Sequence, residues 1–502
     1  MRFCCKFVIV ITAFFLSLPP LMWATDLENR VHKTVLSNGL TVLILERHIS
    51  PTVALYIRHR AGAVDEALGE TGLAHFLEHM MFKGTTSIGT SDYQKEQITL
   101  RRISETGQAI DLERRKGIGA DGKKISEAQV RLDSLQKAHR KFYIPNEIDR
   151  LYTESGAEHF NATTSQDLTS YYVSLPSNKI ELWARIEADR MTNPVFRDFY
   201  VERQVIMEER RQRVESNPSG KLYETFMATA FQAHPYGRPT LGWSSDMSYL
   251  SESAMEEFFR RFYAPNNTVI AIVGSVDAET TLKLVKKYFA SIPSQPLPLP
   301  PVTEEPQQKG ERRMTLAWNA NPRLIIGYHK PNMPHRDDYI LDMVESILIR
   351  GRSSRLKRFL IQQEGAAESI DIRNGLPGNR YPNLFTIFAS PKTPCPPETL
   401  ERLIYGEIER LKVEEVSPEE LGKTKNLLRA DYIRGLSSNE GLAEKLSYFE
   451  AMTGDYRYMT TYLTNMDTVT ADDIRQAAEK YLTAENRTVG ILIPEKSDPQ
   501  NP

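Results

Sequence analysis

Cysteine is nearly absent from this 502-residue sequence, which contains three, two of them (Cys4 and Cys5) close to the start. A chain that keeps only Cys395 cannot form an intramolecular disulfide, so a large hydrophobic core must stabilise it. An excess of one charge is also absent, since 63 Lys and Arg stand against 65 Asp and Glu, for a net charge of −2. Without a strongly basic block, nothing indicates a nucleic-acid partner.

Long apolar runs are absent after residue 24, and a further membrane span is therefore not expected. The first 24 residues differ, because basic side chains precede an apolar run that Pro19 and Pro20 interrupt near its end. This is the outline of a secretory signal peptide. We predict cleavage after Ala24 and a periplasmic or secreted mature protein with no membrane span. An uncleaved anchor is the alternative, which the short run and the proline pair disfavour.

The length of the mature chain predicts at least two domains. A proline-rich and then charged stretch at 291–313 cannot pack as a helix or central strand, so it is expected to be an extended linker. Both flanking parts end alike, with a helical run, an Asn-x-Thr-Val turn and an apolar strand at 264–273 and 484–493, which indicates an internal repeat. We predict an α+β fold of two homologous domains, 25–290 and 314–496, each a mainly antiparallel β-sheet with helices on one face.

Residues 92–150 interrupt the first of these domains. Two charged amphipathic segments flank the glycine-containing turn at 117–122, a pattern that predicts an inserted helical hairpin. Its charges are interpreted as a solvated face, with recognition of a substrate or partner as the alternative.

The most informative stretch is GLAHFLEHMMFKG at 72–84, which predicts a helix capped by Thr71. His75 and His79 would then lie one turn apart on one face, the spacing that lets two imidazoles bind one zinc ion. Glu78 lies beside this pair and can take a proton from a zinc-bound water. The order His-x-x-Glu-His is the inverzincin signature. These polar groups would be costly to bury in an apolar helix without a cation, so we predict one Zn²⁺ per chain.

A catalytic zinc site needs a third protein ligand besides its water. The run 201–211 offers three glutamates, Glu202, Glu208 and Glu209. Glu202 and Glu209 share a helical face, whereas Glu208 lies about 100° round the helix from Glu209. We therefore predict Glu209 as the third ligand and Glu202 as a carboxylate that orients a ligating histidine. Taken alone, such an acidic run is most often an exposed helix.

The second repeat lacks the imidazoles. When Lys83 is aligned with Arg350, the positions of the three motif residues fall on Asp342, Glu345 and Ser346. Only the first domain is therefore expected to bind zinc in this way.

Further segments match a known family, together with the histidine motif and the glutamate run. They are LSNGLTV at 36–42, HFLEHMMFKGT at 75–85, NATT at 161–164, HPYGR at 234–238 and SSRL at 353–356. Over essentially the whole mature chain, the sequence resembles the pitrilysin/insulinase zinc peptidases, in particular half-length members related to mitochondrial processing peptidase. The resemblance implies the same third ligand and supporting glutamate as the helical-face argument. The spacing from His79 to Glu209 is longer than in the family, and the insertion accounts for the excess.

The resemblance implies an exported zinc endopeptidase with the motif glutamate as general base. The peptide would add as a strand to the sheet edge, with Asn161, Ala162 and Thr163 as substrate-binding residues. Arg355 is the candidate for the arginine that, with a tyrosine, steadies the substrate carbonyl in relatives. Glu368 stands where that tyrosine would be, which is a departure from the family pattern.

The family encloses its peptide with four copies of the domain, and this chain supplies two. We therefore predict a homodimer or a heterodimer with a related chain, and the missing tyrosine favours the heterodimer. The alternative function is a non-catalytic homologue that shapes the chamber of a partner.

Overall fold

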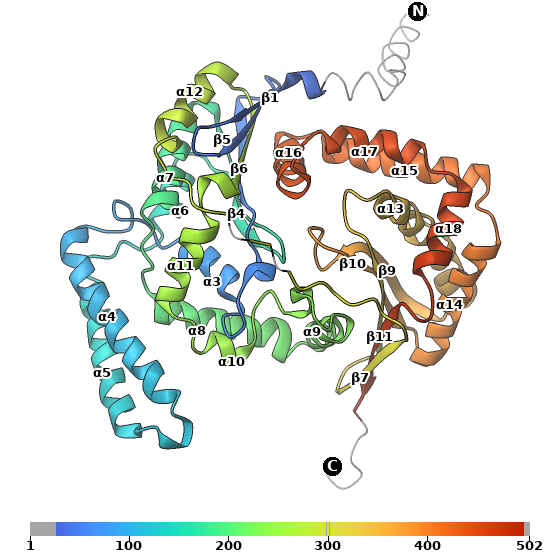
Figure 1. Cartoon of the computed structure of the whole chain (residues 1–502), viewed down its shortest axis with the longest axis horizontal. Coiled ribbons are helices and arrows are strands. Elements are labelled where there is room, and N and C mark those ends of the chain that lie inside the picture. Colours follow the sequence, from blue (N-terminus) through green and yellow to red (C-terminus); the bar gives the residue numbers. More distant parts are fainter. Residues whose placement is uncertain (1–26, 298, 301, 496–502) are drawn as a thin grey trace, which may run out of the picture.

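Figure 1 shows the chain as a computed structural model that describes residues 27–297, 299–300 and 302–495. The predicted signal peptide at 1–24, with Cys4 and Cys5, lies outside the described residues. Within the described part of the chain, no helix combines the length and the apolar character that crossing a bilayer requires.

Two β-sheets organise the molecule, and the predicted α+β class is confirmed. The first sheet has the order β1-β2-β6-β3-β5-β4, and the second has the order β7-β11-β8-β10-β9. Neighbouring strands are antiparallel except in the pairs β2–β6 and β7–β11. The strands are β1 (Val31–Val35), β2 (Thr41–Glu46), β3 (Thr52–His59), β4 (Glu158–Thr164), β5 (Thr169–Pro176), β6 (Thr268–Gly274), β7 (Arg312–Trp318), β8 (Arg323–Lys330), β9 (Ala367–Leu376), β10 (Asn383–Pro391) and β11 (Arg487–Pro494).

The second sheet repeats the first in strand order and strand direction. Strands β2, β6, β3, β5 and β4 correspond in turn to β7, β11, β8, β10 and β9. The edge strand β4 of the first sheet therefore corresponds to the edge strand β9 of the second. The described residues between Phe289 and Arg312 form neither helix nor strand, and they join the two halves.

Helices surround both sheets. In the first half they are α3 (Leu73–Met80), α4 (Tyr93–Arg114), α5 (Gly122–His139), α6 (Glu147–Glu154), α7 (Ile180–Thr192), α8 (Phe199–Arg210), α9 (Pro218–Ala230), α10 (Ser244–Met247), α11 (Glu252–Phe262) and α12 (Ala278–Phe289). In the second half they are α13 (Arg336–Ile349), α14 (Pro397–Val413), α15 (Pro418–Gly435), α16 (Asn439–Thr453), α17 (Tyr458–Asp467) and α18 (Ala471–Tyr481).

The helices of each half pack on one face of its own sheet, as expected, and a helix from the other half covers the second face, which the sequence did not predict. Successive side chains of a strand point to opposite faces. In β2, Val42 and Ile44 pack with α7 and α12, whereas Leu43 and Leu45 pack with α16 of the second half. Reciprocally, α9 of the first half packs on the second sheet (Figure 1). Each half therefore completes the core of the other.

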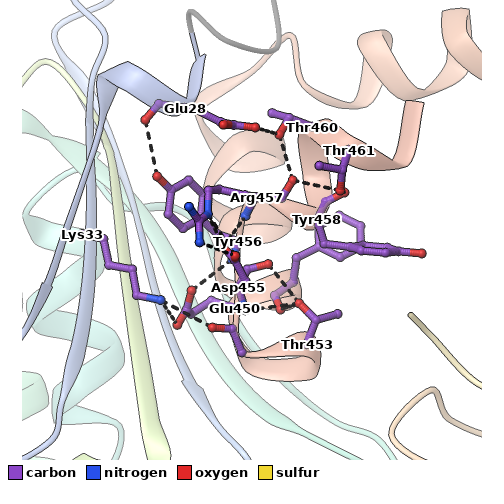
Figure 2. A network of polar contacts seen from close by, with 12 residues as sticks. Glu28, Lys33, Glu450, Thr453, Asp455, Tyr456, Arg457, Tyr458, Thr460 and Thr461 are labelled. Carbon is purple, nitrogen blue, oxygen red and sulfur yellow. Dashed lines mark hydrogen bonds and ion pairs between the residues drawn. The ribbon is translucent and has the colours of Figure 1, made fainter. Parts of the chain in front are cut away.

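A polar network also joins the two halves along β1 (Figure 2). Lys33 donates to the Glu450 carboxylate at 2.6 Å, and the same carboxylate accepts the backbone N–H of Tyr456 at 3.0 Å. Thr460 donates to the carboxylate of Glu28. Because the Glu450 side chain is only 3% exposed, these partners supply the hydrogen bonds that a buried carboxylate requires.

Helices α4 and α5, within 92–150, pack side by side. The base of this helix pair is anchored by Glu96, a fully buried carboxylate that bonds to Arg197 at 2.7 Å and to His139 at 2.7 Å. Burial alone would raise the pKa of Glu96, but the bonds from His139 and Arg197 outweigh it and lower the pKa to about 2. The charged form of Glu96 therefore stabilises the junction between the hairpin and the sheet domain.

Candidate metal centre

The motif helix α3 is preceded by Gly72, its N-cap residue, whose φ of 91° favours glycine. The prediction that Thr71 caps this helix is wrong, because its hydroxyl donates to Asp246 at 2.7 Å instead. The carboxylate of Glu66 takes that role and accepts the backbone N–H groups of Gly72 at 2.9 Å and Ala74 at 2.8 Å. A carboxylate at a helix N-terminus also interacts favourably with the helix dipole. Glu66 therefore fixes the start of the helix that carries the histidines.

The structure brings the side chains of His75, His79 and Glu209 together. These three side chains are called the metal cluster below. Helix α3 packs against α8, and a single carboxylate oxygen of Glu209 lies 3.8 Å from Nε2 of His75 and 3.6 Å from Nε2 of His79. Glu208 points elsewhere and bonds to Arg211 and Gln212 at the surface. These placements match the helical-face argument for the third ligand.

The three donor atoms suit a metal ion better than they suit one another. Their separations of 3.6 and 3.8 Å are too long for hydrogen bonds, but they are close to the roughly 3.3 Å expected between ligand atoms of a tetrahedral zinc site. Two imidazoles and one carboxylate are also a donor set that zinc accepts in catalytic sites. The residues present therefore fit a zinc ion.

Electrostatics prepares the two imidazoles differently. Burial, with the nearby His79 and Arg213, lowers the pKa of His75 to about 3, which keeps this ring neutral as a metal ligand must be. Burial also disfavours a charged His79, but the hydrogen bond and charge of Glu202 outweigh it and raise the pKa of His79.

Glu202 contacts the nitrogen of His79 that faces away from Glu209. Its carboxylate is 2.9 Å from Nδ1 of His79, and its other oxygen accepts from Lys83 at 2.6 Å. Burial raises the pKa of Glu202, but hydrogen bonds from His79 and Lys83 lower it to about 2. A charged carboxylate on Nδ1 directs Nε2 of His79 toward Glu209.

Glu78 faces the cluster from the same helix. The hydroxyl of Thr164, at the end of β4, donates to its carboxylate at 2.5 Å. Burial raises the pKa of Glu78, and the Thr164 hydrogen bond works against that rise. A carboxylate whose pKa is raised is a stronger base than an exposed one, which suits a group that accepts and releases a proton.

The predicted substrate-binding residues Asn161, Ala162 and Thr163 lie on β4, an edge strand of the first sheet. Strand β4 contacts α3 and pairs with β5 on one side. Asn161 and Thr163 are exposed and Ala162 is buried, as expected for alternating side chains. The strand edge thus lies next to the metal cluster.

Arg355 is not brought to the metal cluster. Its guanidinium group forms a two-pronged ion pair with Glu420, at 3.0 and 2.7 Å, within the second half. Glu368 is an exposed residue of the edge strand β9. In this structure, the arginine is therefore committed to α15 rather than to a substrate carbonyl.

The metal-free repeat places α13 where the first half has α3. There Asp342 accepts hydrogen bonds from Asn374 at 2.8 Å and Tyr462 at 2.7 Å, and Glu345 pairs with Arg350 at 3.2 Å. These contacts satisfy the carboxylates of Asp342 and Glu345, whereas the buried hydroxyl of Ser346, the third aligned position, has no hydrogen-bond partner among the described residues.

Four residues that support the site escaped sequence reasoning: Glu66, Lys83, Thr164 and Arg213. Arg213 pairs with Glu209 at 3.1 Å, and its spacing of four residues from Glu209 is a signal that helical periodicity offers. Lys83 and Thr164 lie inside segments already singled out. Nothing local marks Glu66, because its role depends on how the loop before α3 folds.

Comparison with family models identifies the class of protein. The model described as "Insulinase (Peptidase family M16)" matches residues 41–100 and 140–243, and "Peptidase M16 inactive domain" matches 249–428. The first match leaves out 101–139, which holds most of the hairpin. The chain belongs to the insulinase, or M16, peptidase family.

Within this family, the chain is similar to zinc protease PqqE of Helicobacter pylori, with 25% identity over 92% of this chain and 93% of the relative. A crystal structure of a protease from Helicobacter pylori has a TM-score of 0.77 at 24% identity, over 92% of this chain and 99% of the other. The structure of the periplasmic protease PqqL from Escherichia coli has a TM-score of 0.67 at 15% identity, and 92% of this chain corresponds to 47% of that one. These two structures share the fold of this chain.

Proposed function

We propose that the chain is an exported, zinc-dependent endopeptidase that hydrolyses peptides or unfolded polypeptides. The observation that carries this proposal is the convergence of His75, His79 and Glu209 on one point, with Glu78 beside them. The family and the zinc-protease names of relatives support the same reaction class.

Each residue has a role in this proposal. His75, His79 and Glu209 would hold Zn²⁺, one ion per chain. Bound zinc would polarise the scissile carbonyl and acidify a water molecule. Glu78 accepts a proton from the attacking water and passes it to the leaving nitrogen, while Thr164 holds the carboxylate in place.

The peptide is proposed to pair with the free edge of β4. Main-chain hydrogen bonds from an edge strand orient an extended peptide without regard to its sequence. Asn161, Ala162 and Thr163 are the proposed contacts, and their nearness to α3 would place the scissile bond at the metal cluster.

The test is a Glu78→Gln variant assayed for zinc content and for cleavage of a peptide mixture. Zinc content should match that of the wild type because the three ligands are intact, whereas cleavage should be lost. Cleavage at the wild-type rate would remove Glu78 from the mechanism. Loss of wild-type cleavage on addition of a chelator, and its return with zinc, would show that the reaction depends on the metal.

The chain is further proposed to act as a pair, either a homodimer or a heterodimer with a related chain. This chain covers 47% of the PqqL structure, so two chains of this length would together match the length of that protein, which supports pairing. A partner would also supply the arginine and tyrosine that Arg355 and Glu368 do not provide here. The second candidate function is therefore a non-catalytic member that shapes a partner's chamber. A light-scattering measurement of the purified mature chain, with a parallel cleavage assay, distinguishes an active monomer from a pair.

Three domain-level expectations also stay proposals: the units 25–290 and 314–496, the linker 291–313, and the insertion at 92–150. Export to the periplasm or medium is proposed from the first 24 residues. N-terminal sequencing of the protein recovered outside the cytoplasm should begin at Thr25.

A further inference from the structure

A cavity of about 350 Å³ lies beside the metal cluster, between the two halves of the chain. Its walls include Ser165, Arg213 and Leu241 from the first half and Pro377 from the second. The volume is at the lower end of the range for small-molecule pockets. A single large side chain is therefore a more suitable occupant than a folded segment.

Three of the wall residues are directly linked to the metal cluster. Ser165 follows Thr164, the residue that donates to Glu78. Arg213 lies 3.1 Å from the carboxylate of Glu209.

The third link runs through the start of the motif helix. A Cβ atom built on Gly72 would lie 2.9 Å from the carbonyl oxygen of Leu241, so this loop lies against α3. A peptide whose scissile bond is at the metal cluster would therefore have a neighbouring residue at the mouth of the cavity.

The lining is chiefly apolar, with Val214, Tyr223, Met227, Leu241 and Pro377 among its residues. Among the described residues that line it, the one carboxylate is that of Glu224, which is buried and already paired with Arg210 at 2.8 Å and Lys221 at 3.0 Å. An incoming cation would find no free acidic partner there.

The basic side chains of the lining also disfavour a positively charged occupant. Arg213 pairs with Glu209, and Arg238 donates to the backbone carbonyl of Glu66 at 2.8 Å. Guanidinium groups repel another cation, so the lining disfavours a lysine or arginine side chain.

The wall from the second half is held in place. The segment after Pro377 is fastened to the first half, because the backbone N–H of Asn379 donates to Asp167 at 2.6 Å and Arg380 pairs with Asp65 at 2.8 Å. Tyr236 donates to the other oxygen of Asp167 at 2.6 Å. The cavity is therefore formed before any ligand binds.

We propose that this cavity is a specificity pocket that receives a large apolar side chain of the peptide residue flanking the scissile bond and excludes lysine and arginine. The assignment rests on the proposed peptidase function, and it adds the class of side chain that the substrate carries next to the cleaved bond.

Leu241 is the residue through which to test this pocket. It is half-buried in a loop before α10, so a substitution there leaves the sheets and helices intact. Leu241→Glu places a carboxylate in the pocket, and Leu241→Trp fills it. Leu112→Glu is the matched control, because this leucine is 64% exposed on the hairpin.

The first measurement is the cleavage-site profile of the zinc-loaded full chain on a peptide library, read by mass spectrometry. At one position flanking the cut, the wild type should prefer Phe, Tyr, Leu and Met over Lys and Arg by at least about tenfold in kcat/KM, since apolar pockets discriminate on this scale. Leu241→Glu should reverse that preference and Leu241→Trp should shift it to small residues, whereas Leu112→Glu should keep the wild-type profile. A profile unchanged by both Leu241 variants would overturn the pocket.

The second measurement separates the pocket from the reaction. The Glu78→Gln variant, loaded with zinc, is titrated with paired peptides that carry Phe or Lys at the flanking position. Tighter binding of the Phe peptide, lost on adding Leu241→Glu, supports the pocket even if the wild type cleaves nothing, an outcome that would count against the endopeptidase alone. Equal binding of both peptides would refute the pocket.

Discussion

Removal of the Glu202 carboxylate should weaken zinc binding although this residue is not a predicted ligand. Glu202 makes two contacts in the site, at 2.9 Å to Nδ1 of His79 and at 2.6 Å to Lys83. Glu202→Gln keeps a hydrogen-bond acceptor for Nδ1 but loses the charge. Glu202→Ala loses both and leaves a half-buried ammonium group on Lys83 without this partner.

The expected decrease in zinc affinity follows from the loss of the Glu202 charge and of its hydrogen bond to His79. Residues that support metal ligands typically contribute 10- to 100-fold in metal affinity. We expect Glu202→Gln at the lower end, about 10-fold or 1.4 kcal/mol, because only the charge is removed. Glu202→Ala should lie near the upper end, about 100-fold, because His79 also loses its orienting partner.

Competition with a chromophoric chelator measures the zinc dissociation constant of each purified variant. Glu208→Gln is the matched control, since Glu208 lies on the same helix, is exposed and bonds only to neighbouring surface residues. It should bind zinc within about twofold of the wild type, in line with a surface substitution. If Glu202→Ala binds zinc within threefold of the wild type, or if Glu208→Gln is weakened as much, the orienting role is refuted.

Three further predictions concern the ligand, the junction between the halves and the hairpin. Glu209→Gln should lower zinc affinity more than Glu202→Gln does, because it removes a ligand charge; equal losses in the chelator assay would contradict this. Arg380→Ala should destabilise the chain by about 3 kcal/mol in urea unfolding, since it leaves the buried Asp65 unpaired, whereas the exposed Arg373→Ala should cost under about 0.5 kcal/mol. Because the pKa of Glu96 is lowered from 4.5 to about 2, its contribution is present above pH 4.5 and is lost as the pH falls toward 2. Melting curves should show this loss in the wild type and a weaker pH dependence in Glu96→Gln; identical curves would contradict it.

Local periodicity explains why much of the candidate site was predictable. His75 and His79 are four positions apart in the sequence, and Glu202 and Glu209 are seven apart, which is close to one and two helical turns. The two side chains of each pair therefore share a helix face whatever the tertiary fold. The same reasoning separated Glu208 from Glu209, and the structure places them on different sides of α8. The strand repeat was visible for a similar reason, because both copies end in the same turn and apolar strand.

The features that the sequence did not predict depend on tertiary contacts. Whether a sheet is covered on one face or two depends on helices that arrive from elsewhere, and α16 reaches β2 from nearly 400 positions further along the chain. The capping of α3 by Glu66 likewise depends on a loop conformation that leaves Thr71 bonded to Asp246. Arg355 was selected from its motif, and its pairing with Glu420 follows from the packing of α15.

The second half of the chain contacts the loop that precedes α3. Arg380, from the turn between β9 and β10, forms a two-pronged ion pair with Asp65, the residue directly before the Glu66 that caps α3. A displacement of that turn would therefore shift the start of α3 as well as the wall of the proposed pocket. Because a catalytic group must be held within a fraction of an ångström, this contact would help to fix the proposed site. The two halves are thus joined not only by shared hydrophobic cores but also at the point where the site requires rigidity.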